Sequence, residues 1–323
     1  MSQQIFAYIT HREGKADDTA AELVVAAKKI NPDAPVTAIV VGSGVDAVCS
    51  EVAALYNEVW KIDSDALAYP NAEVIRGLLV KVLPADAILL APHDTFGMDL
   101  CPGLSIKLDS AFVSDSVGFE GIEDGKLAVV RQEYSGMVST HVLCDISAGA
   151  VINVRPGAFQ PDESAGAGGS VADKTGDAGD IPGLGRRFIE VVEAEVGDVD
   201  ITKSEILVSV GRGIEDQDNI EIINELAEAV GGDVSCSRPI VDAKWLEKSR
   251  QVGTSGQTVK PKVYMALGIS GSFQHMGGIK GAPFMVAVNK NPKAPIFQFA
   301  DVGIVADILE FVPELAEKVK ETK

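Results

Sequence analysis

The stretch at residues 206–243 reads ILVSVGRGIEDQDNIEIINELAEAVGGDVSCSRPIVDA, and its pattern decides the fold of the second half of the chain. The apolar run ILVSV ends in GRG and is followed by NIEIINELAEAV, where apolar residues recur at spacings of three and four. A second short run, DVSC, begins directly after two glycines. Strand, turn, helix and strand in this order predict a unit of a parallel sheet covered by helices.

The same alternation extends in both directions along the chain. Towards the C-terminus we expect strands in VYMALGISGS (263–272), FMVAVNK (284–290) and IFQFADVG (296–303), with a closing helix from about Asp307. In the first 150 residues the expected strands are QIFAYIT (4–10), VTAIVVG (36–42), VWKID (59–63) and AILLAP (87–92). The expected helices between them are DDTAAELVVAAKKI (17–30), GVDAVCSEVAALY (44–56) and NAEVIRGLLVKVL (71–83).

Between about 110 and 155 the spacing changes. LAVVRQEYSG (127–136), VSTHVLCDI (138–146) and AVINVRP (150–156) follow one another without helix-like segments, which predicts added strands. The polar stretch ESAGAGGSVADKTGDAGDIPGLG (163–185) has the composition of a loop or linker, although RRFIEVVEAEVG (186–197) could hold a short strand. A length of 323 residues favours two domains, and we place them at 1–200 and 201–323.

Composition excludes several function classes. The formal charge of -19 would repel nucleic acid and anionic lipid surfaces. The N-terminus lacks the pattern of a secretory signal, and no apolar stretch reaches the length of about 18 residues needed to span a membrane, so we expect a cytoplasmic protein. The four cysteines and four histidines are scattered without metal-ligand spacing, which favours buried free thiols over a metal site.

Glycine and polar residues gather where the strands of the second half are expected to end. Gly211-Arg212-Gly213, Cys236-Ser237-Arg238, Gly268-Ile269-Ser270-Gly271 and Asn289 all occupy such positions. In a parallel sheet the carboxyl ends of the strands share one edge, where ligands bind and helix N-termini present N–H groups to anions. These turns could therefore converge on one nucleotide, although each by itself could be an ordinary turn.

The residues of this region resemble a known family. The run QVGTSGQTVKPKVYMALGISGSFQHMGGIKGAPFMVAVNKNPKAPIFQFADVGIVADILEFVPEL, together with SVGRGI and SCSRPIVDA upstream, resembles the FAD domain of electron transfer flavoprotein alpha subunits. The resemblance is dense over about 205–315 and looser over the first domain. It implies a flavodoxin-like or Rossmann-like FAD-binding domain after an adenine-nucleotide-hydrolase-like domain that forms the subunit interface.

Carried over by position, the resemblance implies three groups of FAD contacts. One group lies against the flavin or its pyrophosphate, a second runs beside the isoalloxazine ring and wraps the ribityl and pyrimidine side, and a third holds the adenosine end. The first group is Arg212, Ser237 and Arg238; the second is Val252, Gly253, Thr254, Ser255, Ser270, Gly271, Ser272, Phe273, Gln274 and His275; the third is Asn289, Asp307 and Ile308.

The resemblance gives His275 a tuning role, as a cationic or donating imidazole beside the flavin carbonyl that gains negative charge on one-electron reduction. Such a contact could shift a flavin potential by roughly 60 to 130 mV. The chain departs from the common VGQTG by reading VGTSG, so that Thr254 replaces glutamine and Ser255 replaces threonine. That form resembles electron-bifurcating members of the family.

The implied partners are an electron transfer flavoprotein beta subunit, in a heterodimer, and an acyl-CoA dehydrogenase of fatty acid beta-oxidation. A bifurcating protein would also serve NADH and ferredoxin through the beta subunit, and the sequence leaves this subclass and a simple electron carrier both open. Two other hypotheses stay open: a nicotinamide-dependent dehydrogenase, although GRGIEDQ lacks the GxGxxG pattern, and a non-redox adenine-nucleotide-binding scaffold.

Overall fold

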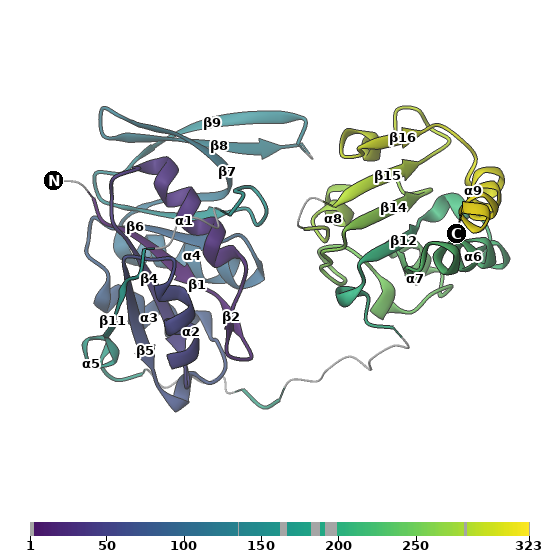
Figure 1. The fold of residues 1–323 in the computed structure, drawn as a ribbon. Coiled ribbons are helices and arrows are strands. Elements are labelled where there is room, and N and C mark those ends of the chain that lie inside the picture. Colours follow the sequence, from purple (N-terminus) through teal and green to yellow (C-terminus); the bar gives the residue numbers. More distant parts are fainter. Residues whose placement is uncertain are drawn as a thin grey trace. The chain divides into compact units, whose positions relative to one another are not determined.

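A computed structural model of the chain describes residues 3–134, 136–161, 167–181, 188–190, 199–280 and 283–322. The chain forms two compact units, Met1–Ile189 and Glu190–Lys323, each with its own sheet (Figure 1). The α/β class predicted for both halves is confirmed. The boundary near residue 200 stays a prediction, and most of the segment 186–197 lies outside the described residues.

The first unit is built on a nine-stranded sheet in the order β11-β5-β4-β1-β6-β10-β7-β8-β9. The strands from β11 to β7 pair in parallel, and β8 and β9 extend the sheet as an antiparallel meander. The strands are β1 Ile5–Ile9, β4 Val36–Gly42, β5 Glu58–Asp63, β6 Ile88–Pro92, β7 Ala111–Glu123, β8 Lys126–Glu133, β9 Val138–Asp145, β10 Ala150–Val154 and β11 Ser170–Asp173. A two-stranded ribbon, β2 His11–Arg12 and β3 Lys15–Ala16, follows β1.

Helices cover both faces of this sheet. Strand β1 is buried along its whole length, as expected for a central parallel strand, and its alternate side chains enter two separate cores. One core contains side chains of α1 and α2, and the other contains those of α3 and α4. The helices are α1 Thr19–Ile30, α2 Asp46–Ala53, α3 Ala72–Val82, α4 Thr95–Leu108 and the short α5 Thr175–Ala178.

The strands and helices expected before residue 92 are confirmed, as are the added strands after 126. The prediction of a loop over 163–185 is wrong for β11 and α5. The side chains of β11 are mostly exposed, so this edge strand carries no apolar alternation, and its pairing with β5 defines it instead.

The second unit holds a five-stranded parallel sheet in the order β13-β12-β14-β15-β16. In chain order this is 2-1-3-4-5, the doubly wound order of flavodoxin-like folds. The strands are β12 Ile206–Val210, β13 Asp233–Cys236, β14 Val263–Leu267, β15 Phe284–Val288 and β16 Val302–Ile304. Within IFQFADVG, a 3-10 turn at Pro295–Gln298 occupies the first part, and β16 begins only at Val302.

The two faces of the second sheet are covered differently. Helices α6 Ile220–Val230 and α9 Ile308–Thr322 pack on one face, with α7 Arg238–Asp242 beside them. The opposite face is covered mainly by connecting segments, which contribute Val252, Ile269 and Ile296 to the core, and by the short helix α8 Phe273–Met276. These connecting segments also build the cavity described next.

All four cysteines are free and buried, as predicted. In the described part of the chain, no helix combines the length and apolar character needed to cross a bilayer.

Candidate cofactor site

A cavity of about 760 Å³ lies at the carboxyl ends of the strands of the second unit, within the range of about 300–1,000 Å³ typical of small-molecule sites. It opens beside the turns after β12 and β14, between which the strand order reverses, the usual ligand position in such sheets. Its lining residues are Arg212, Gly213 and Glu215 after β12; Ser237, Arg238, Pro239 and Asp242 after β13; Gln251, Val252, Gly253, Thr254 and Ser255; Gly268, Ile269, Ser270, Ser272, Gln274 and His275 after β14; and Asn289 after β15.

Two glycine turns touch at the switch point. The N–H of Gly213 donates to the carbonyl of Gly268 over 3.1 Å. A Cβ atom at Gly213 would stand 2.7 Å from the Cα of Gly268, closer than real side chains approach. Gly268 also has a φ of +64°, which other residues rarely adopt. Both glycines are therefore required for the turns to meet beneath the cavity.

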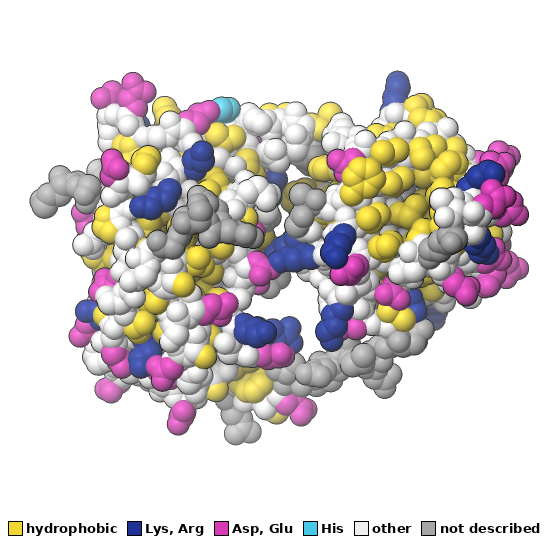
Figure 2. Space-filling model, in the orientation of Figure 1, with side chains coloured by type: hydrophobic (Ala, Val, Ile, Leu, Met, Phe, Trp, Pro, Cys, Tyr) yellow, Lys and Arg dark blue, Asp and Glu magenta, His cyan; other side chains and the backbone are white. Residues whose placement is uncertain are grey.

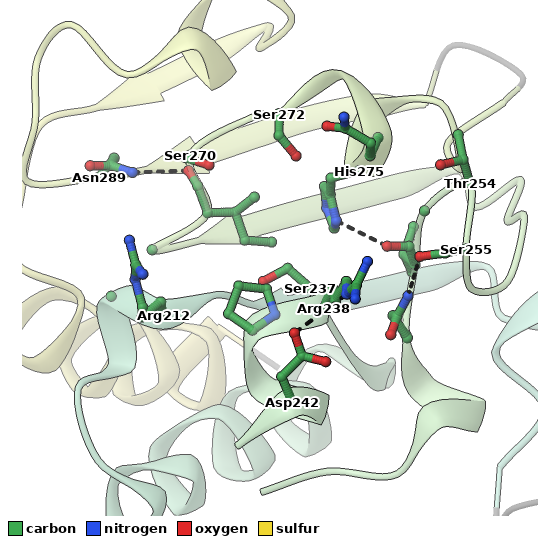
Figure 3. A pocket seen from close by; sticks show the side chains of 18 of the residues that line it. Arg212, Ser237, Arg238, Asp242, Thr254, Ser255, Ser270, Ser272, His275 and Asn289 are labelled. Atoms are coloured by element: carbon green, nitrogen blue, oxygen red, sulfur yellow. Dashed lines mark hydrogen bonds and ion pairs between the residues drawn. The ribbon is translucent and has the colours of Figure 1, made fainter. Parts of the chain in front are cut away.

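Two arginines approach the cavity from the ends of β12 and β13 (Figure 3). The side chain of Arg238 is 69% exposed, and its Nε lies 3.4 Å from a carboxylate oxygen of Asp242. An exposed pair of this kind contributes little to stability. The guanidinium of Arg238 can therefore turn towards an anionic ligand at low cost.

The loop after α7 places a hydroxyl at the cavity wall. The N–H of Val252 donates to the carbonyl of Cys236 over 2.9 Å, which anchors the loop to the end of β13. The side-chain amide of Gln251 donates to Oγ of Ser255 over 3.0 Å (Figure 3). Because the oxygen of Ser255 is already an acceptor, its own proton is available for donation elsewhere.

His275 is 5% exposed, and both of its ring nitrogens have protein partners. Nδ1 lies 3.1 Å from the carbonyl oxygen of Val252 and Nε2 lies 2.9 Å from the hydroxyl of Tyr264. Burial lowers the pKa of His275 to about 4, although the hydrogen bond to Val252 opposes this shift. The low-dielectric surroundings disfavour the cationic form of the imidazole at neutral pH, and the expectation of a donating imidazole beside the flavin stays a prediction.

The residues expected at the adenosine end lie apart. Asn289 lines the cavity and donates from Nδ2 to the carbonyl of Ile269 over 2.9 Å. Asp307 accepts from the N–H of Leu309 at the start of α9 and pairs with Lys290 at 2.9 Å, and hydrogen bonding to Lys290 lowers the pKa of this carboxyl. Ile308 is buried in the core beneath α9.

Most of the predicted set is brought together: twelve of the sixteen residues line the cavity, and Gly271, Phe273, Asp307 and Ile308 do not. The lining residues Gly213, Gly268 and Ile269 belong to turns that the sequence placed at a nucleotide site. Four further lining residues were not predicted, and most of them are close in sequence to predicted ones: Glu215, Pro239, Asp242 and Gln251.

The donor set suits a dinucleotide carrying phosphates. Two guanidinium groups, the hydroxyls of five serine and threonine side chains, and close-packed glycine backbone surround the cavity. Guanidinium groups bind phosphate through paired hydrogen bonds. Of the two lining carboxylates, Glu215 pairs with Lys290 at 2.8 Å and Asp242 lies beside Arg238.

Comparison with known proteins gives matches along most of the chain. Residues 5–178 match the family described as electron transfer flavoprotein domain, and residues 200–280 match the electron transfer flavoprotein FAD-binding domain. The chain is 35% identical to an electron transfer flavoprotein subunit alpha of Methylophilus methylotrophus, over 97% of this chain and 98% of that protein. It is 32% identical to the subunit alpha of Thermoanaerobacterium thermosaccharolyticum, over 99% of both chains. It is also 29% identical to the LctC subunit of lactate dehydrogenase (NAD(+),ferredoxin) of Acetobacterium woodii, over 98% of this chain and 77% of that protein.

Proposed function

This chain belongs to the electron transfer flavoprotein alpha-subunit family, and from that premise we propose that it passes single electrons between protein partners through a bound FAD. The observation that carries the proposal is the coincidence of two regions. The cavity is built almost entirely from residues 212–275, and these lie inside the segment that matches the FAD-binding domain.

The residues of the cavity have distinct tasks in this proposal. Arg212 and Arg238 would hold the pyrophosphate, and the hydroxyl of Ser255 would serve the isoalloxazine ring. When bound, that ring would supply the electron transfer. The loop at 251–255 and the turn at 270–275 would hold the ring, and Asn289 would hold the adenosine end.

A carrier must also dock on other proteins, and both units expose apolar side chains. In the first unit, Ile122, Met137 and Leu143 are 45%, 83% and 69% exposed on and between strands β7–β9. In the second, Phe284, Phe299 and Val302 are 52%, 50% and 41% exposed, and Figure 2 shows apolar side chains gathered over β15 and β16. Such patches often mark interaction surfaces. We assign the first to a beta subunit in a heterodimer and the second to a dehydrogenase that exchanges electrons with FAD.

The finer assignment is an electron-bifurcating protein that takes electron pairs from NADH and divides them between ferredoxin and an acyl-CoA dehydrogenase. The VGTSG motif and the likeness to a subunit of an enzyme whose name includes NAD(+) and ferredoxin support it. A simple carrier for an acyl-CoA dehydrogenase needs only the same FAD site.

The first test is to purify the chain with its beta subunit and excess FAD and to measure flavin absorbance per heterodimer. We expect a yellow protein whose flavin occupancy falls, or whose midpoint potential shifts, in Arg238→Ala. Arg238→Lys should have a smaller effect because it keeps the charge. A colourless wild-type complex would refute the FAD carrier, and unchanged behaviour of Arg238→Ala would favour a nucleotide-binding scaffold.

The second test addresses the subclass by anaerobic titration of the heterodimer with NADH, with and without ferredoxin and the acyl-CoA dehydrogenase. A bifurcating protein reduces both acceptors in equal numbers of electrons, and reduction of ferredoxin stops when the dehydrogenase is omitted. Reduction of the dehydrogenase alone would identify a simple carrier.

A further inference from the structure

A row of buried polar side chains lies on the loop-covered face of the second sheet, directly behind the cavity. Ser235 on β13 pairs in register with Ser209 on β12, and Tyr264 lies on the next strand, β14. All three residues are fully buried, with 0% exposure each. Tyr264 in turn contacts His275, whose ring reaches the cavity wall. Four polar side chains thus connect the middle of the sheet to the site.

The partners of His275 determine which nitrogen carries its proton. The carbonyl oxygen of Val252 can only accept, so Nδ1 at 3.1 Å must be the protonated nitrogen. In the neutral ring Nε2 is then an acceptor, and Tyr264, at 2.9 Å, must donate its hydroxyl proton to it. Burial lowers the pKa of His275 and so favours this neutral form.

The phenol of Tyr264 has further neighbours. Burial raises its pKa, and the hydroxyls of Ser209 and Ser235 lie near enough to oppose that rise. Neither serine hydroxyl forms a hydrogen bond with a described residue in the structure, Tyr264 included. The hydrogen bond that the phenol forms is the one to Nε2 of His275.

The far end of the row is the loop that lines the cavity. Val252 is 1% exposed. Its N–H donates to the carbonyl of Cys236, and its own carbonyl accepts a hydrogen bond from Nδ1 of His275. The next residue, Gly253, has a φ of +144°, and its N–H donates to the carbonyl of Gln257. The carbonyl of Val252 is thus a fixed point from which the 253–255 turn starts, and the imidazole holds it.

We propose that Tyr264 is a positioning residue of the cofactor site: its hydroxyl donates to Nε2 of His275 and holds the ring with Nδ1–H on the carbonyl of Val252, which clamps the loop at 252–255 against the turn at 270–275. His275 acts here as a neutral brace between two segments of the cavity wall. Without the phenol, Nε2 loses its buried donor and the ring is held only by the bond from Nδ1 to Val252, so the clamp loosens. The effect on FAD rests on the proposed function, whereas the hydrogen bond between Tyr264 and His275 does not.

The experiment compares the wild-type heterodimer with Tyr264→Phe, which removes the hydroxyl and keeps the ring. Nitrogen NMR of histidine-labelled protein, assigned with His275→Gln, distinguishes protonated from bare ring nitrogens. We expect a protonated Nδ1 and a bare Nε2 in the wild type, and in Tyr264→Phe the same tautomer with a shifted Nε2 resonance, because that nitrogen has lost its hydrogen-bond donor. FAD should dissociate roughly two- to tenfold faster from the variant, which corresponds to the loss of one hydrogen bond.

The matched control is Tyr56→Phe, because the hydroxyl of Tyr56 donates to the carbonyl of Ala20 over 2.7 Å in the core of the first unit. It loses a buried hydrogen bond of the same kind and should leave both the Nε2 resonance of His275 and FAD dissociation unchanged. An unchanged Nε2 resonance in Tyr264→Phe overturns the proposal. If that variant does not fold, the wild-type spectrum decides, because a protonated Nε2 with a bare Nδ1 is incompatible with it. A chain that never binds FAD refutes the carrier function and leaves the tautomer measurement intact.

Discussion

At the scale of single residues, two side chains at the cavity wall are held in place by hydrogen bonds to neighbouring residues. Ser255 receives a hydrogen bond from Gln251, and His275 is held by Tyr264 and the carbonyl of Val252. Supporting contacts of this kind set the direction in which a functional proton points.

Gln251 offers a direct test of this orientation. Gln251→Leu keeps most of the volume but removes the amide that donates to Ser255, so the serine hydroxyl is free to rotate. We expect FAD to bind roughly two- to tenfold more weakly, the range for one neutral hydrogen bond, measured by fluorescence titration of the heterodimer. Gln257→Leu makes the same chemical change two residues beyond Ser255. Equal weakening in both variants would contradict a specific role for Gln251.

His275 also makes the stability of the second unit depend on pH. Its folded pKa of about 4 lies below the ordinary value of 6.5, so the unfolded chain binds the proton more tightly. The contribution of the neutral ring is complete above about pH 6.5 and is lost as the pH falls towards 4. From this residue the free energy of unfolding should decrease by about 3 kcal/mol over that interval.

The measurement is denaturant unfolding at several pH values, followed by the fluorescence of Trp245 in a Trp60→Phe background. These are the two tryptophans of the chain, and Trp245 belongs to the second unit. His275→Gln should show a shallower dependence between pH 6.5 and 4, whatever its stability at neutral pH. If the unfolding free energy of the wild type and of His275→Gln changed with pH by the same amount, the prediction would be wrong, because folding would then not lower the pKa of His275.

At the scale of elements, the cavity depends on how turns meet at the end of the sheet. The turns after β12 and β14 touch through Gly213 and Gly268, while the loop after α7 is anchored to the end of β13. None of these segments is a long helix or strand. Their positions follow from the parallel register of β12, β13 and β14, which brings three carboxyl ends to one edge.

Gly213→Ala should disturb this meeting point. The new methyl group would stand 2.7 Å from the Cα of Gly268, so the turns must separate. We expect a loss of about 1–3 kcal/mol in the free energy of unfolding of the second unit, together with reduced FAD occupancy, measured by urea unfolding and flavin absorbance. Gly176→Ala is the control, since a Cβ there meets nothing within 4 Å. Full FAD occupancy in Gly213→Ala would show that the turns can adapt.

At the scale of the whole molecule, the two units differ in what they contribute to the cofactor site. Among the described residues, all those that line the cavity belong to the second unit. Hydrogen–deuterium exchange of the heterodimer with and without FAD should therefore show protection concentrated at about 209–215, 235–256 and 268–276. Peptides of 5–178 should change little in comparison. Equal protection in both units would mean that FAD binding orders the whole chain.

Much of the fold could be predicted from sequence because the central strands are buried on both faces. Runs such as IFAYI and ILVSV are almost entirely apolar, with Ser209 as the polar exception, and apolar residues in the helices between them repeat at three and four residues. The edge strand β11 could not be predicted, because its exposed side chains carry no such pattern. Helix α4 was not expected either, and it includes glycines and a proline that weaken the helical signal.

The sequence by itself determined the two α/β units, the polar turns that follow the strands and, through their resemblance to a family, the cofactor. Only the tertiary structure decided that His275 is neutral and braced by Tyr264, that Gln251 orients Ser255, and that Asp307 and Ile308 lie away from the cavity wall. Periodicity reports which side chains are buried, because burial repeats with the geometry of a strand or helix. A hydrogen-bond partner, and with it the charge of a buried ring, depends on which distant segments the fold brings within about 3 Å.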